Sequence, residues 1–308
     1  MGKNKLRITE GLLGLLLMAS LACGLPQALQ NQALSTKTPG TQNETPVQPA
    51  SPQPKGTTQE APQTNPNTPN NGNNTANPNL KMVSFNGIRF SYDPELAKDV
   101  KTGVVPATGP ESDQQPIFTV NAKEDQFNFQ EYTIKSSMEA SLLVFPVNEY
   151  EKLGGDIIVQ NVDTLKKMLA ARPKNYSGKL PYLPVGNGGQ VIQAKMKYIN
   201  FQNGAGFRYL TQLASDVSPV TNDRLVYIYQ GISTDGGYYV SAIFPVTSTV
   251  LPANYDEAMK GQDDQKFSQN FTQYLSDVQG KLDGQGDDTF HPKLTLLDEM
   301  MGSIEIKK

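Results

Sequence analysis

The feature that most limits what this chain can fold into is a tract of about 56 residues, from 25 to 80, without a single aromatic side chain. Pro, Gln, Asn, Thr and Ser dominate it, and stretches such as TNPNTPNNGNNTANPN carry no charge. Such a segment buries too little apolar surface to offset the conformational entropy lost on folding. We therefore expect a disordered linker over residues 23–80, with a root-mean-square reach of roughly 40 Å, and a single globular domain over residues 81–308.

The N-terminus has the composition of a secretory signal. Lys3, Lys5 and Arg7 form a basic start, and an apolar run from residue 12 to residue 22 precedes the only cysteine, Cys23. A membrane-spanning helix needs about 20 apolar residues, so this run is too short to remain in the bilayer. The pattern predicts a signal peptide over residues 1–22.

Ala22, Cys23 and Gly24 resemble the cleavage site of a bacterial lipoprotein, although Ser20 stands where that family usually has Leu. The resemblance implies that Cys23 receives a diacylglycerol and palmitate and becomes the first mature residue. The protein is then anchored to the cell membrane on its extracytoplasmic face. Several buried acyl chains give stable anchoring where one gives only marginal binding. The alternative is an ordinary cleaved signal with an incidental cysteine.

The remaining sequence predicts an α+β fold. Strand patterns occur at residues 82–92, 127–135, 140–147, 190–201, 206–214, 224–233, 237–246 and 303–307. Helical spacing occurs at residues 161–173, 267–278 and 294–301. Short turn-like joins link the four strands between residues 190 and 246, so they are expected to pair as an antiparallel β-sheet meander with helices packed against it.

Two short segments, FSYDP at residues 90–94 and MMGSIEI at residues 300–306, are similar to the Mog1/PsbP-like α/β sandwich. Members of that fold act as binding or assembly proteins, so the resemblance implies binding rather than catalysis. Fold alone does not fix function.

Catalytic and metal motifs are scarce in the sequence. His291 is the only histidine, and neither a G-x-S-x-G elbow nor a phosphate-binding Gly-rich loop is present. No catalytic residue, cofactor or metal site is predicted. Paired carboxylates leave open a carboxylate-dependent hydrolase of cell-envelope polymers; the candidate acids are Asp256, Glu257, Asp263, Asp264, Asp283, Asp287 and Asp288. The loop from Asp283 also offers oxygen atoms for calcium, without the spacing of an EF-hand.

Tyrosines concentrate in the meander. Residues two apart on a strand share a face, so Tyr227 and Tyr229 point the same way. If that face is open, Tyr209, Tyr227, Tyr229 and Tyr239 with Arg208 form a surface that binds a polar ligand, such as a glycan, a peptide or an envelope protein. The alternative is that both faces are covered and the tyrosines belong to the core.

The net charge narrows the range of partners. The formal net charge is −3, whereas nucleic-acid-binding proteins usually carry a clustered excess of positive charge. The sequence therefore predicts a lipid-anchored extracytoplasmic protein whose domain binds a ligand or partner non-catalytically. The alternatives are the hydrolase and a structural envelope component.

Overall fold

A computed structural model describes residues 79–110, 112, 115–174, 176 and 178–308. The signal peptide, Cys23 and nearly all of the linker lie outside these residues, so they stay predictions. The strands are β1 (Lys81–Phe85), β2 (Ile88–Tyr92), β3 (Asp99–Val105), β4 (Glu124–Gln130), β5 (Ser141–Pro146), β6 (Gly189–Gln190), β7 (Ala194–Phe201), β8 (Gly204–Thr211), β9 (Leu213–Ala214), β10 (Val226–Ser233), β11 (Tyr238–Pro245) and β12 (Glu305–Ile306). The helices are α1 (Val147–Ala171), α2 (Tyr255–Met259), α3 (Asp264–Gln269), α4 (Phe271–Asp283) and α5 (Leu294–Ser303), with 3₁₀ turns η2 (Ile117–Thr119) and η3 (Asp287–Thr289).

The central feature is a seven-stranded sheet in the order β3-β4-β5-β11-β10-β8-β7, in which every neighbouring pair is antiparallel. The predicted meander is confirmed, because β7, β8, β10 and β11 pair in sequence order. The predicted α+β class is confirmed as well.

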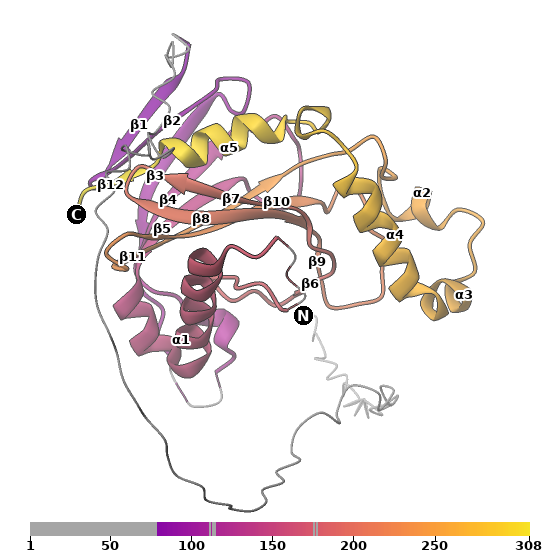
Figure 1. The fold of residues 1–308 in the computed structure, drawn as a ribbon, viewed down its shortest axis with the longest axis horizontal. Coiled ribbons are helices and arrows are strands. Elements are labelled where there is room, and N and C mark those ends of the chain that lie inside the picture. Colours follow the sequence, from indigo (N-terminus) through magenta and orange to yellow (C-terminus); the bar gives the residue numbers. More distant parts are fainter. Residues whose placement is uncertain (1–78, 111, 113–114, 175, 177) are drawn as a thin grey trace, which may run out of the picture. The chain divides into compact units, whose positions relative to one another are not determined.

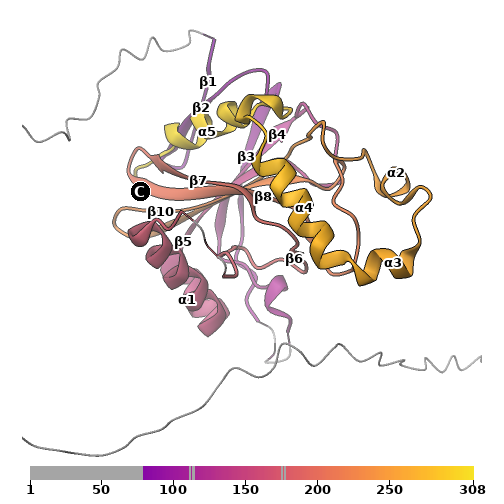
Figure 2. The same cartoon turned by 45° about the vertical axis from the view of Figure 1, so that its right-hand side comes forward.

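Both faces of this sheet are covered (Figure 1). Helix α1 packs on one face, against β5, β8 and β10. On the other face lie α5 and the small sheet β1-β2-β12, and α5 contacts both β2 and β7. Helix α4 runs beside β7 (Figure 2), and the α2 and α3 turns lie beyond it. The result is three layers with two apolar cores.

Successive side chains of a strand point to opposite faces of the sheet, so the residues of the meander alternate between the two cores. Tyr227, Tyr229 and Phe244 belong to the core beneath α5, which we call the α5-side core. Val226 and Ile228, on the opposite face of β10, belong to the core beneath α1, the α1-side core. Strand β10 is buried along its whole length, as expected for a strand sandwiched between two covered faces.

A tight hairpin turn at Asn86 and Gly87 joins β1 to β2, with φ angles of 47° and 74°. Both angles are positive, as a type I′ turn requires. The helix expected at residues 161–173 begins earlier, at Val147, and bends at Gly155, whose φ is 56°. Gly154 and Gly155 interrupt the apolar spacing of the helix, so the sequence pattern does not reveal the first turns of α1. Within the described part of the chain, no helix is long and apolar enough to cross a membrane.

Candidate functional site

The predicted tyrosine surface is wrong, because the side chains that were to form it are buried. Tyr209, Tyr227, Tyr229 and Tyr239 each have 0% exposure. Tyr227 and Tyr229 do share a face, but α5 and the small sheet cover it. Tyr209 and Tyr239 lie on the other face, under α1. Alternation shows which residues share a face, and it does not show whether a distant segment covers that face.

Three of these tyrosines have internal hydrogen bonds. The Tyr227 hydroxyl donates to Asp298 at 3.1 Å, that of Tyr229 to the Ile199 carbonyl at 3.0 Å, and that of Tyr239 to Gln230 Oε1 at 2.7 Å. The Tyr209 hydroxyl has no hydrogen-bond partner among the described residues. Burial raises the pKa of all four hydroxyls, so they stay protonated and serve packing.

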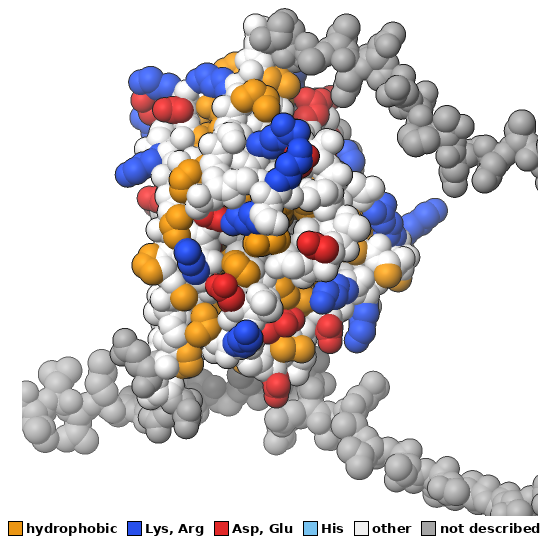
Figure 3. Space-filling view, turned by 90° about the vertical axis from the view of Figure 1, so that its left-hand side faces the viewer, with side chains coloured by type: hydrophobic (Ala, Val, Ile, Leu, Met, Phe, Trp, Pro, Cys, Tyr) orange, Lys and Arg blue, Asp and Glu red, His pale blue; other side chains and the backbone are white. Residues whose placement is uncertain are grey.

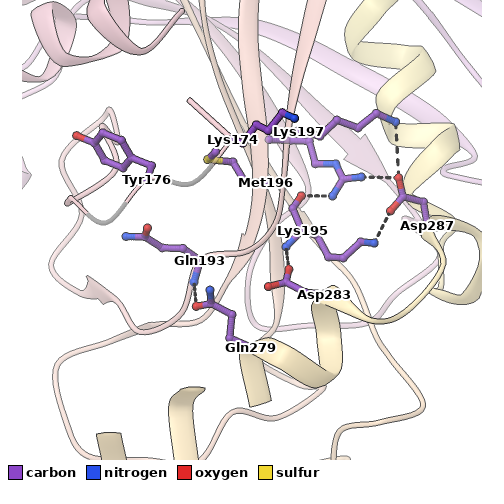
Figure 4. Close-up of a pocket in the computed structure, with 10 residues that line it drawn as sticks. Lys174, Tyr176, Gln193, Lys195, Met196, Lys197, Gln279, Asp283 and Asp287 are labelled. Carbon is purple, nitrogen blue, oxygen red and sulfur yellow. Dashed lines mark hydrogen bonds and ion pairs between the residues drawn. The ribbon is translucent and has the colours of Figure 1, made fainter. Parts of the chain in front are cut away.

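Arg208, the fifth predicted residue, leads to a different site. It forms part of a cavity of about 570 Å³ between β7 and α4, which we call the β7–α4 pocket (Figure 4). The lining residues are Lys174, Tyr176, Gln193, Lys195, Met196, Lys197, Arg208, Gln279, Asp283 and Asp287. The volume falls in the range of small-molecule sites.

The Arg208 guanidinium forms the floor of the pocket, and its side chain is only 1% exposed. Its Nε lies 3.2 Å from Asp298 Oδ1, and its Nη2 lies 2.7 Å from Asp287 Oδ2. Its Nη1 donates to the Lys195 carbonyl. A buried guanidinium is stable only when it is paired and hydrogen-bonded in this way.

Lys195 connects the floor to α4. Its backbone is left-handed, with φ of 57°, at a bulge in β7. This conformation lets its N–H donate to Asp283 at 2.5 Å while its carbonyl accepts from Arg208. Its ammonium donates to Asp287 at 2.9 Å and to the Gln285 carbonyl at 2.7 Å. Left-handed non-glycine residues are rare and concentrate at ligand clamps and other functional sites.

Of the acids considered for hydrolysis, Asp283 and Asp287 line this pocket and the other five do not. Burial by itself raises the pKa of Asp287, but the hydrogen bonds and charges of Lys195 and Arg208 outweigh it and lower the pKa below its usual value. Asp287 is therefore a fixed anion that holds the cations in place, which is the opposite of a general acid.

The pocket has an excess of positive charge. Lys174, Lys195, Lys197 and Arg208 supply four cations, against three carboxylates from Asp283, Asp287 and Asp298. Lys197 reaches Asp298 at 2.8 Å, and this hydrogen bond raises its pKa, so the ammonium stays charged. Lys174 has no ion-pair partner among the described residues. Lys197, whose side chain is 48% exposed, and Lys174 are the two cations most open to a ligand.

No group of three His, Cys, Asp or Glu side chains within the described ranges is arranged to hold a metal ion. The acidic loop proposed for calcium contributes its Asp287 to the ion-pair network instead. His291 pairs with Thr247 through backbone hydrogen bonds, and its Nε2 lies 3.2 Å from Thr133 Oγ1. It does not line the β7–α4 pocket.

Two features of the sequence point to this site. Lys195 and Lys197 lie two apart on a strand, and Asp298 interrupts the apolar face of α5, where it is only 8% exposed. A charged residue at a buried helix position implies a buried partner. Finding that partner required the fold, because Arg208 lies 90 residues away.

No protein-family model matches this chain, and no curated protein shows significant similarity to it.

Proposed function

We propose that this is a lipid-anchored extracytoplasmic protein whose β7–α4 pocket binds a ligand bearing a carboxylate or phosphate group, without chemistry of its own. The observation that carries the proposal is the convergence of four cations on one cavity where Asp287 and Asp298 are already ion-paired and Asp283 accepts a backbone hydrogen bond from Lys195.

The arrangement separates cations that build the site from cations that are available to a ligand. Arg208 and Lys195 are held by Asp287, Asp298 and backbone carbonyls. Lys174 and Lys197 stand at the opening and retain donors for an incoming anion. An anion bound there experiences a field that is fixed in advance, so little reorganisation is required.

The kind of ligand follows from the rest of the lining. Gln193 and Gln279 are neutral hydrogen-bonding groups, and Tyr176 and Met196 supply apolar surface. This mixture suits a glycan or peptide that bears an acidic group. The face shown in Figure 3 does not suit a nucleic acid, because acidic and basic side chains are interspersed on it and form no continuous basic patch.

Binding is tested with a matched pair of sugars, glucuronate and glucose, titrated into the full-length protein in detergent micelles. We expect saturable binding of glucuronate and none of glucose. The K174Q/K197Q double variant is expected to weaken glucuronate binding at least tenfold, and K260Q, at an exposed lysine outside the pocket, to leave it unchanged. Inorganic phosphate and an N-acetylated glutamate peptide extend the panel. Failure of all three anionic probes (glucuronate, phosphate and the glutamate peptide) to bind contradicts the proposed function.

Anchoring is tested separately. Cells expressing the protein are fed an alkyne-tagged palmitate, and the membrane and soluble fractions are compared with those of C23A. Label in the protein and its loss in C23A support lipidation at Cys23. An unlabelled protein supports the alternative, an ordinary cleaved signal.

A further inference from the structure

Glu124, the first residue of β4, is a buried carboxyl group without a partner. It is 8% exposed, and it forms no hydrogen bond or ion pair with any described residue. Its neighbour Asp125 is equally buried but accepts a hydrogen bond from Asn86 Nδ2 at 2.8 Å and pairs with the Lys308 ammonium. Buried carboxylates are normally paired, so an unpaired one requires an explanation.

Glu124 lines a cavity of about 380 Å³ at the end of the sheet where α1 begins. The lining residues are Asn86, Gly87, Lys123, Glu124, Asp125, Pro146, Glu149, Tyr238, Lys307 and Lys308. We call this the Glu124 pocket. It shares no lining residue with the β7–α4 pocket. Ligand binding at one pocket can therefore be tested independently of the other.

The charged groups around Glu124 leave it without compensation. Lys308 is paired with Asp125, and Lys307 lies 2.8 Å from Glu305. Lys123 is exposed and forms no ion pair with Glu124. On α1, Glu149 adds another carboxylate, and Tyr150 contributes a protonated hydroxyl whose own pKa is raised to about 12, mainly by burial.

Burial raises the pKa of Glu124 to about 7. Ionising this group in the empty pocket is costly because no cation stabilises the charge. A cation that enters the pocket removes that cost, whereas a neutral ligand does not. The pocket wall already accommodates an ammonium group, since Lys308 Nζ lies 5.1 Å from the centre of the Tyr238 ring.

From this geometry we infer that the Glu124 pocket binds a primary ammonium group, as carried by a diamine or by a lysine side chain, with Glu124 as its counter-ion. Glu149, at the exposed side of the pocket, is positioned to attract a second ammonium or to steer the first. The small volume suits a single alkyl ammonium chain.

The test uses 1,5-diaminopentane and, as a neutral ligand of the same length, pentane-1,5-diol. Both are titrated into the full-length protein by calorimetry. We expect the diamine to bind and the diol not to bind. Because only ionised Glu124 pairs with the ammonium, affinity is expected to fall about tenfold between pH 8 and pH 6. E124Q is expected to abolish diamine binding, and E299Q, which removes an exposed acid of α5 outside the pocket, to leave it intact.

A second readout does not depend on the variants. The side-chain carboxyl carbon of Glu124 is titrated by NMR with and without saturating 1,5-diaminopentane, and its pKa is expected to fall on binding. N-acetyl-lysine amide then distinguishes a peptide-borne ammonium from a free diamine. Diamine binding that E124Q leaves intact, an unchanged Glu124 titration, or no binding at about pH 8 each overturns the inference.

Discussion

Asp298 on α5 and Arg208 on β8 form an ion pair between residues 90 positions apart, with Arg208 Nε 3.2 Å from Asp298 Oδ1. Tyr227 donates to the same carboxylate oxygen at 3.1 Å. This relationship fixes α5 to β8 and β10 of the main sheet and also places the guanidinium at the floor of the β7–α4 pocket. Stability and the proposed ligand binding therefore depend on the same two side chains.

Removing Arg208 alone is expected to destabilise the domain strongly. R208M removes the buried guanidinium that bonds both carboxylates and leaves Asp298 with Lys197 and Asp287 with Lys195 as remaining cations. We therefore expect a loss of about 3 kcal/mol in the free energy of unfolding, at the lower end for breaking a buried ion pair. Urea denaturation followed by circular dichroism measures it. D298N in the R208M background should recover part of the loss, because it removes a carboxylate that has lost one of its two cations. A loss below about 1 kcal/mol contradicts a structural role for the pair.

Two buried tyrosines on the same side of the sheet form a matched pair. The Tyr239 hydroxyl donates to Gln230, whereas that of Tyr209 has no partner within the part of the chain that the structure describes. We expect Y239F to cost about 1 kcal/mol, the usual net value of one hydrogen bond. Y209F should cost nothing or stabilise the fold, since it removes an unsatisfied polar atom. The stability of both variants is measured by thermal and urea unfolding. Equal losses of stability in Y239F and Y209F would show that the Tyr209 hydroxyl has a hydrogen-bond partner.

The raised pKa of Glu124 predicts that the stability of the fold decreases as the pH rises. Its pKa is about 7 in the folded protein, against a usual value of 4.5. Between these values the unfolded chain binds fewer protons at this site than the folded chain, so stability falls as pH rises. The full effect is on the order of 3 kcal/mol, reached above about pH 7.

E124Q removes this dependence. The variant should match the wild type near pH 4.5 and exceed its stability at about pH 8. E299Q serves as the control for loss of a single charge. Parallel stability curves for E124Q and wild type from acid to neutral pH would show that Glu124 titrates normally.

Two glycines in the main sheet differ in the room around them. A Cβ at Gly206 would lie 2.4 Å from the Tyr229 ring and 2.6 Å from the Gln230 carbonyl, whereas a Cβ at Gly103, on the edge strand β3, meets nothing within 4 Å. G206A is expected to cost about 1–3 kcal/mol through overpacking. G103A is expected to be neutral or to stabilise by about 0.5 kcal/mol. Similar unfolding midpoints for both variants would contradict the close packing around Gly206.

Local patterns predicted much of the fold. Alternation and turn residues identify β7, β8, β10 and β11, and because these strands are consecutive, pairing followed directly. Strand β3 was missed: its alternate residues are only partly buried at the sheet edge, and Gly103 weakens the pattern. The start of α1 was missed because Gly154 and Gly155 interrupt the helical spacing.

The candidate site was less predictable, because it depends on contacts between distant segments. Arg208 was singled out as a companion of tyrosines on an open surface, and it instead lies beneath a pocket whose other cations come from β7 and the segment after α1. The cover over Tyr227 and Tyr229 comes from β2 and α5, which lie on either side of the meander in sequence. No pattern within a single strand carries that information.

The small sheet joins the first two strands of the domain to its last strand. Strand β2 is bordered by β12, and Arg89 pairs with Glu305, 216 residues later. The Asn203 side chain bonds both backbone groups of Ile306, at 2.6 and 3.0 Å. The β1–β2 hairpin, although made early, therefore gains its neighbour only when almost the entire domain has been synthesised. A chain that stops before α5 lacks the helix that covers the α5-side core, so the apolar side chains of that core stay exposed to solvent until α5 has been made.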